Sequence, residues 1–340
     1  MKRKALFAAC IAVISLVTAC GLNNAAGGRK ENNKIVLNEE DLVIGSDGTE
    51  DKADEKSDLK DSTAKNDKKV SMPIEIGDKT KRCFAAGGTS GYLVLTDEDR
   101  NYYFQYIDSV AETIETFETK VCDGKSILNM AVDKDNNLSL FLLDGISEGN
   151  TEGARIVKID KNGTLLSEDD ISAFFERNLY NRTDMAFDKN GRCCFTFKNA
   201  IIGVNGQDCE DVACTENDGK LKLIDFDNGR TVRVVLNSGG EEEILVDGAD
   251  GNFTKEVLPQ FAASYYDVKA QEDGIYLFNQ EGGIIRYSDE EGIFETVVSK
   301  EDLKFSGHDV YGAGFLEDGR IMVLIMTETE SRIEIIPYRK

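Results

Sequence analysis

From about Ser71 to Lys340, the chain consists of short apolar segments, rich in Val, Ile, Tyr and Phe, separated by acidic turn sequences. Alternation of apolar and polar residues is typical of a half-buried β-strand, and Asn-Gly and Asp-Gly pairs between such runs favour hairpin turns. The chain has only three prolines, and its best helical pattern is short, from Glu168 to Asn178. The pattern therefore predicts an all-β fold.

A unit of apolar strand, acidic turn and apolar strand recurs along this region. The aspartates that anchor its turns are 55, 39, 46 and 45 residues apart. They are Asp133, Asp188, Asp227, Asp273 and Asp318. Further strands follow these units, so each period of about 40 to 50 residues holds four strands, which is the signature of a β-propeller blade.

The units predict six antiparallel four-stranded blades. Residues Gly91–Thr119 supply three strands of a blade before the first anchor, with Cys83–Gly88 as its innermost strand. The last blade lacks a fourth strand, whereas a spare strand begins at Ser71. We expect these two to pair, because ring closure leaves no open sheet edge. The longest spacing leaves seven blades as the alternative, and two β-sandwiches would not explain the recurring turn.

The first twenty residues have the parts of an export signal: three positive residues, an uncharged stretch from Ala5 to Val17, and small residues before a cysteine. The stretch, roughly thirteen residues, is shorter than the about 20 that span a bilayer. Val17-Thr18-Ala19-Cys20 resembles the lipobox of bacterial lipoproteins, with Val17 where the family usually has Leu. The resemblance implies removal of residues 1–19, lipidation of Cys20 with acyl chains such as palmitate, and attachment to the extracytoplasmic side of the cell membrane.

Residues 20–70 differ in composition from the rest. From 46 to 69 they are mostly Asp, Glu, Lys, Ser and Thr, without an aromatic residue. Such a segment cannot bury enough apolar surface to offset its chain entropy, so we expect a disordered tether. The expected organisation is a signal peptide (1–19), a lipidated tether (20–70) and a propeller domain (71–340). Lys34–Ile44 is apolar enough for a transient strand or a docking peptide.

Two sequences, "AFDKNGRCCFTF" and "KIDKNGTLL", resemble the D-x-x-G-x-apolar-apolar blade motif of NHL and gluconolactonase-like propellers. The order of lipobox, acidic tether and propeller is similar to the N-terminal part of extracellular solute-binding lipoproteins. That resemblance implies an association with uptake of a carbohydrate solute. In those lipoproteins a solute-binding domain follows the propeller, beyond the position of Lys340, so no transport residue can be assigned.

Candidate chemistry is sparse. His308 is the only histidine, which excludes multi-histidine zinc sites and leaves no Ser-His-Asp arrangement around it. We therefore predict no catalytic residue, no metal and no cofactor. Cys209 and Cys214 are the candidate disulfide of an exported protein, with buried free thiols as the alternative. Cys193 and Cys194 are adjacent on a strand and must face opposite sides of it.

Acidic turns such as those at Asp133 and Asp225 contain residue types found in calcium loops. The residue twelve positions along from Asp133, counted inclusively, is Asp144 rather than the glutamate that a calcium loop requires. Asp, Asn and Gly are also the residues that tight hairpins need. We expect turns here, not cation sites.

The formal net charge is −23, and removal of Lys2, Arg3 and Lys4 with the signal makes it −26. A surface this negative repels phosphate backbones, so nucleic acid is not an expected partner. The expected partners are the membrane, through the lipid, and either a protein or a small carbohydrate.

Two classes of function fit. The first is a binding or scaffold module, in which loops and strands around the central channel hold a ligand. The second is a propeller enzyme of the lactonase or glycoside hydrolase type, which needs carboxylates that converge at the channel. Binding is favoured, because no repeated catalytic constellation occurs. The candidate ligand-binding residues, chosen as aromatic or arginine anchors near the starts of innermost strands, are Arg182, Tyr265, Tyr266 and Tyr311.

Overall fold

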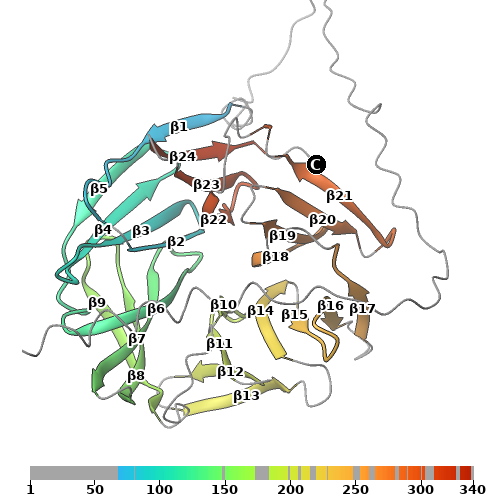
Figure 1. Ribbon diagram of the computed structural model, residues 1–340, viewed down its shortest axis with the longest axis horizontal. Helices are drawn as coiled ribbons and strands as arrows, with labels where there is room; N and C mark the ends of the chain where they lie inside the picture. The colour runs from blue at the N-terminus through green and yellow to red at the C-terminus, as the bar shows by residue number, and fades with distance from the viewer. Residues whose placement is uncertain are drawn as a thin grey trace, which may run out of the picture. The chain divides into compact units, whose positions relative to one another are not determined.

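A computed structural model describes residues 68–79, 81–147, 150–172, 184–197, 200–205, 208–214, 220–227, 229–247, 253–259, 265–279, 283–288, 290–299, 301–302, 310–326 and 330–337. By its internal contacts the chain divides into Met1–Leu59 and Lys60–Lys340, and every described residue belongs to the second unit. The export signal, Cys20 and most of the expected tether lie outside the described residues. The second unit is a ring of six sheets, a six-bladed β-propeller (Figure 1).

Each sheet is one blade of four antiparallel strands, and its innermost strand lies at the centre of the ring (Figure 1). The first three blades are β2 (Lys81–Gly87), β3 (Ser90–Thr96), β4 (Tyr102–Asp108) and β5 (Thr113–Phe117); β6 (Lys125–Val132), β7 (Leu138–Ser147), β8 (Asn150–Ile159) and β9 (Leu165–Asp170); and β10 (Met185–Phe187), β11 (Cys193–Phe197), β12 (Ala200–Asn205) and β13 (Asp208–Cys214).

The other three blades have the same order from the centre outward. They are β14 (Lys220–Asp227), β15 (Arg230–Leu236), β16 (Glu242–Asp247) and β17 (Phe253–Val257); β18 (Tyr265–Gln271), β19 (Gly274–Asn279), β20 (Ile284–Ser288) and β21 (Ile293–Val298); and β22 (Val310–Phe315), β23 (Ile321–Met326), β24 (Ser331–Ile336) and β1 (Val70–Pro73). The prediction of six blades is confirmed, and the alternative of seven is wrong.

The expected helix from Glu168 is wrong in its first three residues. Glu168, Asp169 and Asp170 belong to β9 and pair with β8, with Glu168 opposite Val157. Backbone pairing to the neighbouring strand therefore overrides the local helical pattern.

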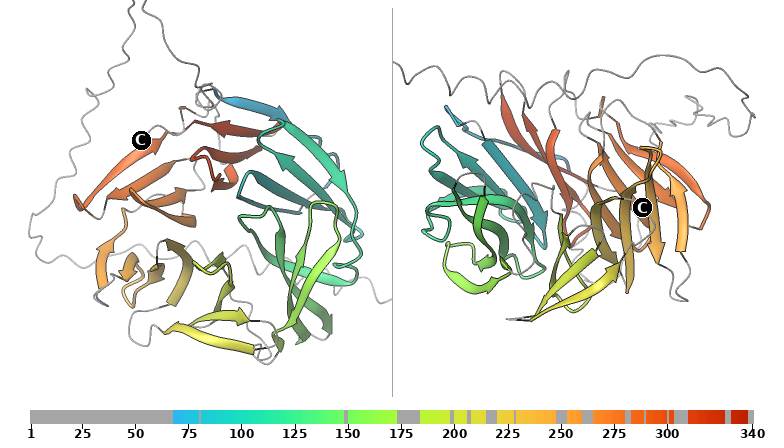
Figure 2. Two further views of the ribbon diagram at one scale, coloured as in Figure 1. Left: turned by 180° about the vertical axis from the view of Figure 1, so that it is seen from behind. Right: turned by 60° about the horizontal axis from the view of Figure 1, so that its bottom comes forward.

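Predicted pairing of the first and last strands closes the ring. Val70 pairs with Ile335 and Pro73 with Arg332, so β1 completes the sixth blade; Figure 2 shows this blue strand beside the red β24. Polar contacts also join this blade to the first, because the Arg320 guanidinium donates to the backbone oxygen of Ser109 at 3.2 Å. The two ends of the chain's propeller region are thus held together by both a sheet and a side-chain contact.

All five predicted anchors lie in turns between the innermost and second strands of successive blades, or at their edges. In the turn at Asp133, carboxylate Oδ1 accepts hydrogen bonds from the backbone N–H groups of Asp135 and Asn137, at 2.9 and 2.8 Å. The left-handed position of this turn is Asn136, with φ 64°. The Oδ2 of Asp133 accepts hydrogen bonds from the Asn137 amide at 3.1 Å and from the Lys158 ammonium at 3.0 Å, so the carboxylate is held by its own turn and by β8.

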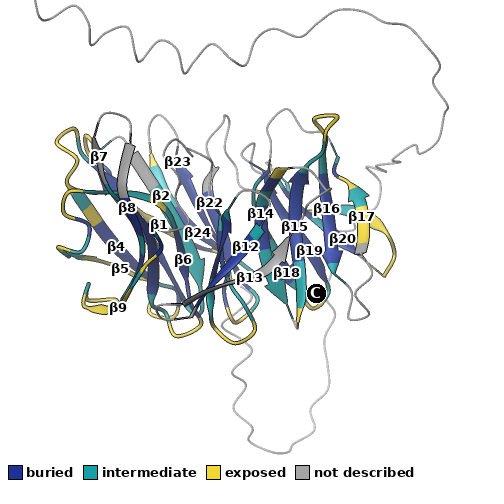
Figure 3. Cartoon of the chain, turned by 90° about the horizontal axis from the view of Figure 1, so that it is seen from below, coloured by how far each residue is buried: buried dark blue, intermediate teal, exposed yellow. Residues whose placement is uncertain are grey.

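The hydrophobic core is divided into clusters that lie between neighbouring blades. In Figure 3 the inner strands are mostly buried, whereas exposed residues concentrate in turns and on outer strands such as β9. Cys193 packs against one cluster and Cys194 belongs to the next, so the two thiols face opposite sides of β11 as expected.

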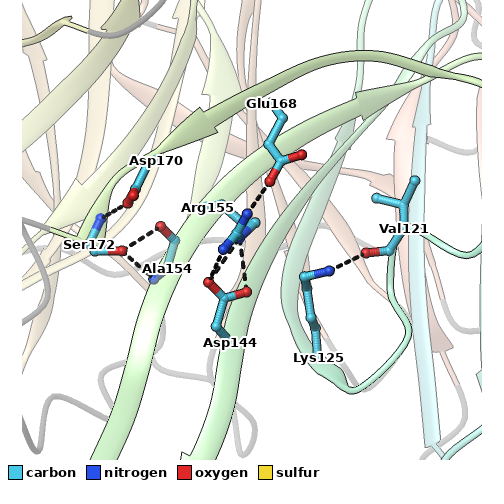
Figure 4. A network of polar contacts seen from close by, with 8 residues as sticks. All are labelled: Val121, Lys125, Asp144, Ala154, Arg155, Glu168, Asp170 and Ser172. Atoms are coloured by element: carbon cyan, nitrogen blue, oxygen red, sulfur yellow. Dashed lines mark hydrogen bonds and ion pairs between the residues drawn. The ribbon is translucent and has the colours of Figure 1, made fainter.

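One blade is further held by an ionic network across its three outer strands. Arg155 on β8 lies between Asp144 on β7 and Glu168 on β9 (Figure 4). Its Nε is 2.9 Å from both carboxylate oxygens of Asp144. These two carboxylates raise the pKa of the Arg155 guanidinium.

Candidate ligand site in the central channel

A cavity of about 380 Å³ lies at the centre of the ring, and residues of all six innermost strands line it. Its volume is within the range of sites that hold small molecules, about 300–1,000 Å³. The propeller architecture alone therefore produces one small chamber to which every blade contributes.

Irregularities in strand pairing determine which side chains reach this cavity. The register of β6, β14 and β18 shifts at Leu128, Lys222 and Tyr266. A β-bulge breaks the alternation of faces, so two successive side chains can face the same way. Each of these residues and its successor line the cavity, which brings Asn129 and Asp267 into it.

Two carboxylates in the cavity also join neighbouring blades. Asp184, directly before β10, accepts hydrogen bonds from the Asn129 amide at 3.4 Å and from the backbone N–H of Ile224 at 2.8 Å. Asp225 on β14 accepts one from the backbone N–H of Ala270 on β18 at 2.7 Å. These contacts span four consecutive blades and fix the orientation of both carboxyl groups.

A lysine and a third carboxylate complete the charged cluster. The Lys269 ammonium is 3.3 Å from Asp267, and the two side chains keep 22% and 21% of their surface accessible. Because both residues line the cavity, their accessible surface faces it. Asp267, Asp225 and Asp184 all raise the pKa of Lys269, which opposes the effect of its burial. The group therefore stays a cation, and a nucleophilic amine is not available here.

The carboxyl groups of Asp184 and Asp225 titrate close to neutrality. Burial raises the pKa of Asp184 to about 7, and the negative charge of Asp267 adds to the rise. Burial also raises the pKa of Asp225 to about 6, although the charge of Lys269 opposes it. Burial raises the pKa of the Tyr266 phenol as well, so it remains a neutral hydrogen-bond donor.

Of the four predicted ligand-binding residues, the structure places Tyr266 in the wall of the cavity. Tyr265 is buried in the core between blades, 2% exposed, and its hydroxyl donates to the backbone oxygen of Pro259 at 3.1 Å. Arg182 lies outside the described residues. Tyr311 is on β22, and its side chain is not among those described. Contact of these residues with a ligand stays a prediction.

Sequence reasoning missed the cavity carboxylates, because they are three among 63 acidic residues. For Asp184 a usable signal is its distance from a turn anchor. Asn129 and Asp184 each stand four residues before an anchor, Asp133 and Asp188, and both line the cavity.

Cys209 and Cys214 lie near the two ends of one strand, β13. Their side chains are not among those described, so the disulfide between them stays a prediction. Cys122, Cys193 and Cys194 are free thiols. Within the described ranges, no group of three or more His, Cys, Asp or Glu residues is arranged to hold a metal ion. His308 is not among the described residues. No helix in the described part of the chain has the length and apolar character needed to cross a membrane.

The fold defines this protein as a six-bladed β-propeller with a polar central cavity. No family model and no curated protein sequence matches it. Among solved structures, it is similar to virginiamycin B lyase from Staphylococcus aureus at 13% identity and a TM-score of 0.48, over 79% of this chain and 98% of the lyase. It is also similar to a streptogramin B lyase at 11% identity and a TM-score of 0.46, over 79% of this chain and 97% of that lyase. The structure of YCF48 bound to D1 peptide is similar at 12% identity and a TM-score of 0.43, over 75% of this chain and 78% of YCF48.

Proposed function

We propose that this protein is an extracytoplasmic binding or scaffold module, attached to the cell membrane through a lipid on Cys20, that holds a small polar ligand in the central cavity of its propeller. The anchor rests on the lipobox-like sequence before Cys20. Several acyl chains on one cysteine would give stable attachment, because each buried methylene adds about 0.8 kcal/mol.

The observation that carries the binding function is the cavity itself. It is lined by every blade and holds charged groups whose positions are fixed by contacts between blades, such as Ile224 N–H to Asp184. Preorganised polar groups in a chamber of this size bind a ligand without a large ordering cost. Carboxyl, amide and phenol groups together suit a hydroxyl-bearing solute, which agrees with the proposed association with carbohydrate uptake. A protein partner is the other class of ligand, whereas nucleic acid is disfavoured by the net charge of −23.

Two measurements test this function. Replacement of Cys20 by alanine is expected to abolish incorporation of labelled palmitate and to release the protein from the membrane fraction. A thermal-shift screen of the purified protein against mono- and disaccharides should give a rise in Tm, because a ligand at 100 times its Kd adds about 2.7 kcal/mol. Retention of Cys20→Ala at the membrane would contradict the anchor, and absence of any shift would contradict the ligand class.

A second candidate function is a propeller enzyme of the lactonase or glycoside hydrolase type. It is favoured by the pKa of Asp184, about 7, because an effective general acid has a pKa near the working pH. Release of nitrophenol from nitrophenyl glycosides, or opening of a sugar lactone, would support it if Asp184→Asn lost the activity. A purified protein that binds sugars but turns none of them over would leave only the binding function.

A further inference from the structure

The charges of the described residues that line the cavity are balanced. Among the described residues that line it, three are aspartates and three are lysines, and none is Glu, Arg or His. They are Asp184, Asp225, Asp267, Lys134, Lys222 and Lys269. Among these described side chains an ionic ligand would find no excess charge of opposite sign to compensate for its lost hydration.

One further carboxylate, which does not line the cavity, makes the net charge of this group of side chains depend on one proton. Glu242 on β16 forms an ion pair with Lys222, so four carboxyl groups face three ammonium groups. The set is neutral when one carboxyl group keeps its proton. Asp184 is the best placed to do so, because burial disfavours its ionised form and the negative charge of Asp267 adds to this effect.

Groups from three other blades share the cavity with Asp184. Asn129 on β6 donates to it, and the charges of Asp267 and Lys269 on β18 act on its carboxyl group. Asp225 on β14 lines the same cavity and acts on the same Lys269 ammonium. A ligand that fills the cavity removes water from all of them. Removal of water favours the uncharged form of a carboxyl group, and the protonated form also gains an O–H donor for a ligand hydroxyl.

We infer that the central cavity takes an uncharged, hydroxyl-bearing ligand, and that Asp184 takes up a proton when this ligand binds. The inference rests on the proposed function and adds the ligand's charge class and its pH dependence. Since the pKa of the free Asp184 is about 7, affinity should be highest below pH 7 and should fall above it. A further rise of one pKa unit on binding corresponds to about a tenfold loss of affinity at high pH.

Calorimetric titration of the full chain tests both parts. The probes are D-glucose, D-galactose and maltose, with D-glucosamine and D-gluconate as cationic and anionic counterparts, at pH 5.5 to 8.5 in buffers of different ionisation enthalpy. We expect a neutral sugar to bind more tightly than either charged probe. We also expect it to bind about tenfold more tightly at pH 5.5 than at pH 8.5, with uptake of up to one proton near pH 7.

Two variants assign the proton. Asp184→Asn keeps the shape of the neutral carboxyl group and should bind with an affinity that no longer changes around pH 7, so that any remaining pH dependence lies near pH 6, where Asp225 titrates. Asp169→Asn is the matched control, because burial also raises the pKa of Asp169, but this residue lies on the outer strand β9 and does not line the cavity. It should keep the pH dependence of the unmodified protein.

The outcomes separate this inference from the proposed function. Tighter binding of a charged probe, or neutral-sugar affinity that is flat with pH, would overturn the inference and leave the binding function intact. Equal pH dependence in the unmodified protein and Asp184→Asn would also overturn it. If no sugar bound at any pH, both the proposed function and the inference would fail.

Discussion

At the scale of single residues, the same residue type has opposite roles in two places. Aspartates in the turns are acceptors for the N–H groups of their own turns, and the pKa of Asp160, for example, is lowered by the backbone N–H of Thr164. Burial raises the pKa values of two cavity aspartates, Asp184 and Asp225. Turn aspartates such as Asp160 therefore stabilise the fold when ionised, whereas Asp184 and Asp225 reduce its stability when ionised.

This difference gives opposite dependences on pH. The folded-state pKa of Asp184 is about 7, above its ordinary value of 3.8, so the folded protein binds more protons between these two values. Its contribution to stability is lost as the pH rises from about 4 to 7. Asp184→Asn should therefore be more stabilising, or less destabilising, at pH 8 than at pH 4.5. The effect of this substitution on the free energy of unfolding should differ between the two pH values by at most about 4 kcal/mol, which corresponds to three pKa units.

Urea unfolding at the two pH values measures this change. Asp160→Asn is the contrasting variant. Because the folded-state pKa of Asp160 is lowered, its contribution is present above its unfolded pKa and is lost as the pH falls through the folded pKa. Asp160→Asn should lower the free energy of unfolding more at pH 8 than at low pH. The same pH dependence in both variants would contradict the raised pKa of Asp184 and the lowered pKa of Asp160.

Backbone conformation at the turns can be tested with two glycines. Gly191 has φ +74°, whereas Gly283 has no left-handed conformation, and a Cβ at either would meet nothing within 4 Å. Gly191→Ala should cost about 1 kcal/mol. Gly283→Ala should be neutral or stabilising by up to about 1 kcal/mol, because it restricts the unfolded chain. Equal urea midpoints for the two variants would contradict the turn account.

At the scale of strands, closure by β1 is the contact that joins the two ends of the propeller. Side chains of β1 alternate between the two sides of the strand: Met72 is buried in the cluster that contains Ile335, and Ser71 is exposed. Strand pairing of this kind follows from the unpaired last blade, which is why it could be predicted before the structure was known.

Met72→Asp would place an unpaired charge in that cluster. We expect it to lower the free energy of unfolding by about 3 kcal/mol, because a buried charge loses its hydration. Ser71→Asp is the matched control on the same strand and should change stability by less than about 0.5 kcal/mol. Urea midpoints of the two variants give the comparison, and a closure that made no contribution would leave both unchanged.

Sequence reasoning predicted the strands, but it did not find the cavity carboxylates or show which of two adjacent tyrosines lines the cavity. The repeated Asp anchors predicted five of the hairpins, since the residue types that a tight turn needs are visible locally. Tyr266 lines the cavity and Tyr265 does not, because the register of β18 shifts between Tyr265 and Asp267. A one-residue shift of this kind depends on pairing with β19, and no single-strand pattern contains it.

At the scale of the whole molecule, the ring brings residues far apart in the sequence into one chamber. Cys83 and Phe315 line the same cavity, although they stand near opposite ends of the propeller region. The cavity carboxylates come from three blades, so no sequence motif could contain them. Fold class could thus be predicted from local repetition, whereas the site is a product of ring closure.

The most direct test of the central claim, that ligand binds in the central cavity, is calorimetric titration of a variant with this cavity filled. Leu128 is 38% exposed and lines the cavity, so Leu128→Trp should occupy ligand space without disturbing the buried core. Leu165, 46% exposed on the outer strand β9, provides the matched control Leu165→Trp. At pH 6, the account predicts that Leu128→Trp weakens binding of a neutral sugar at least tenfold and that Leu165→Trp does not. Unchanged affinity in a folded Leu128→Trp protein would contradict it.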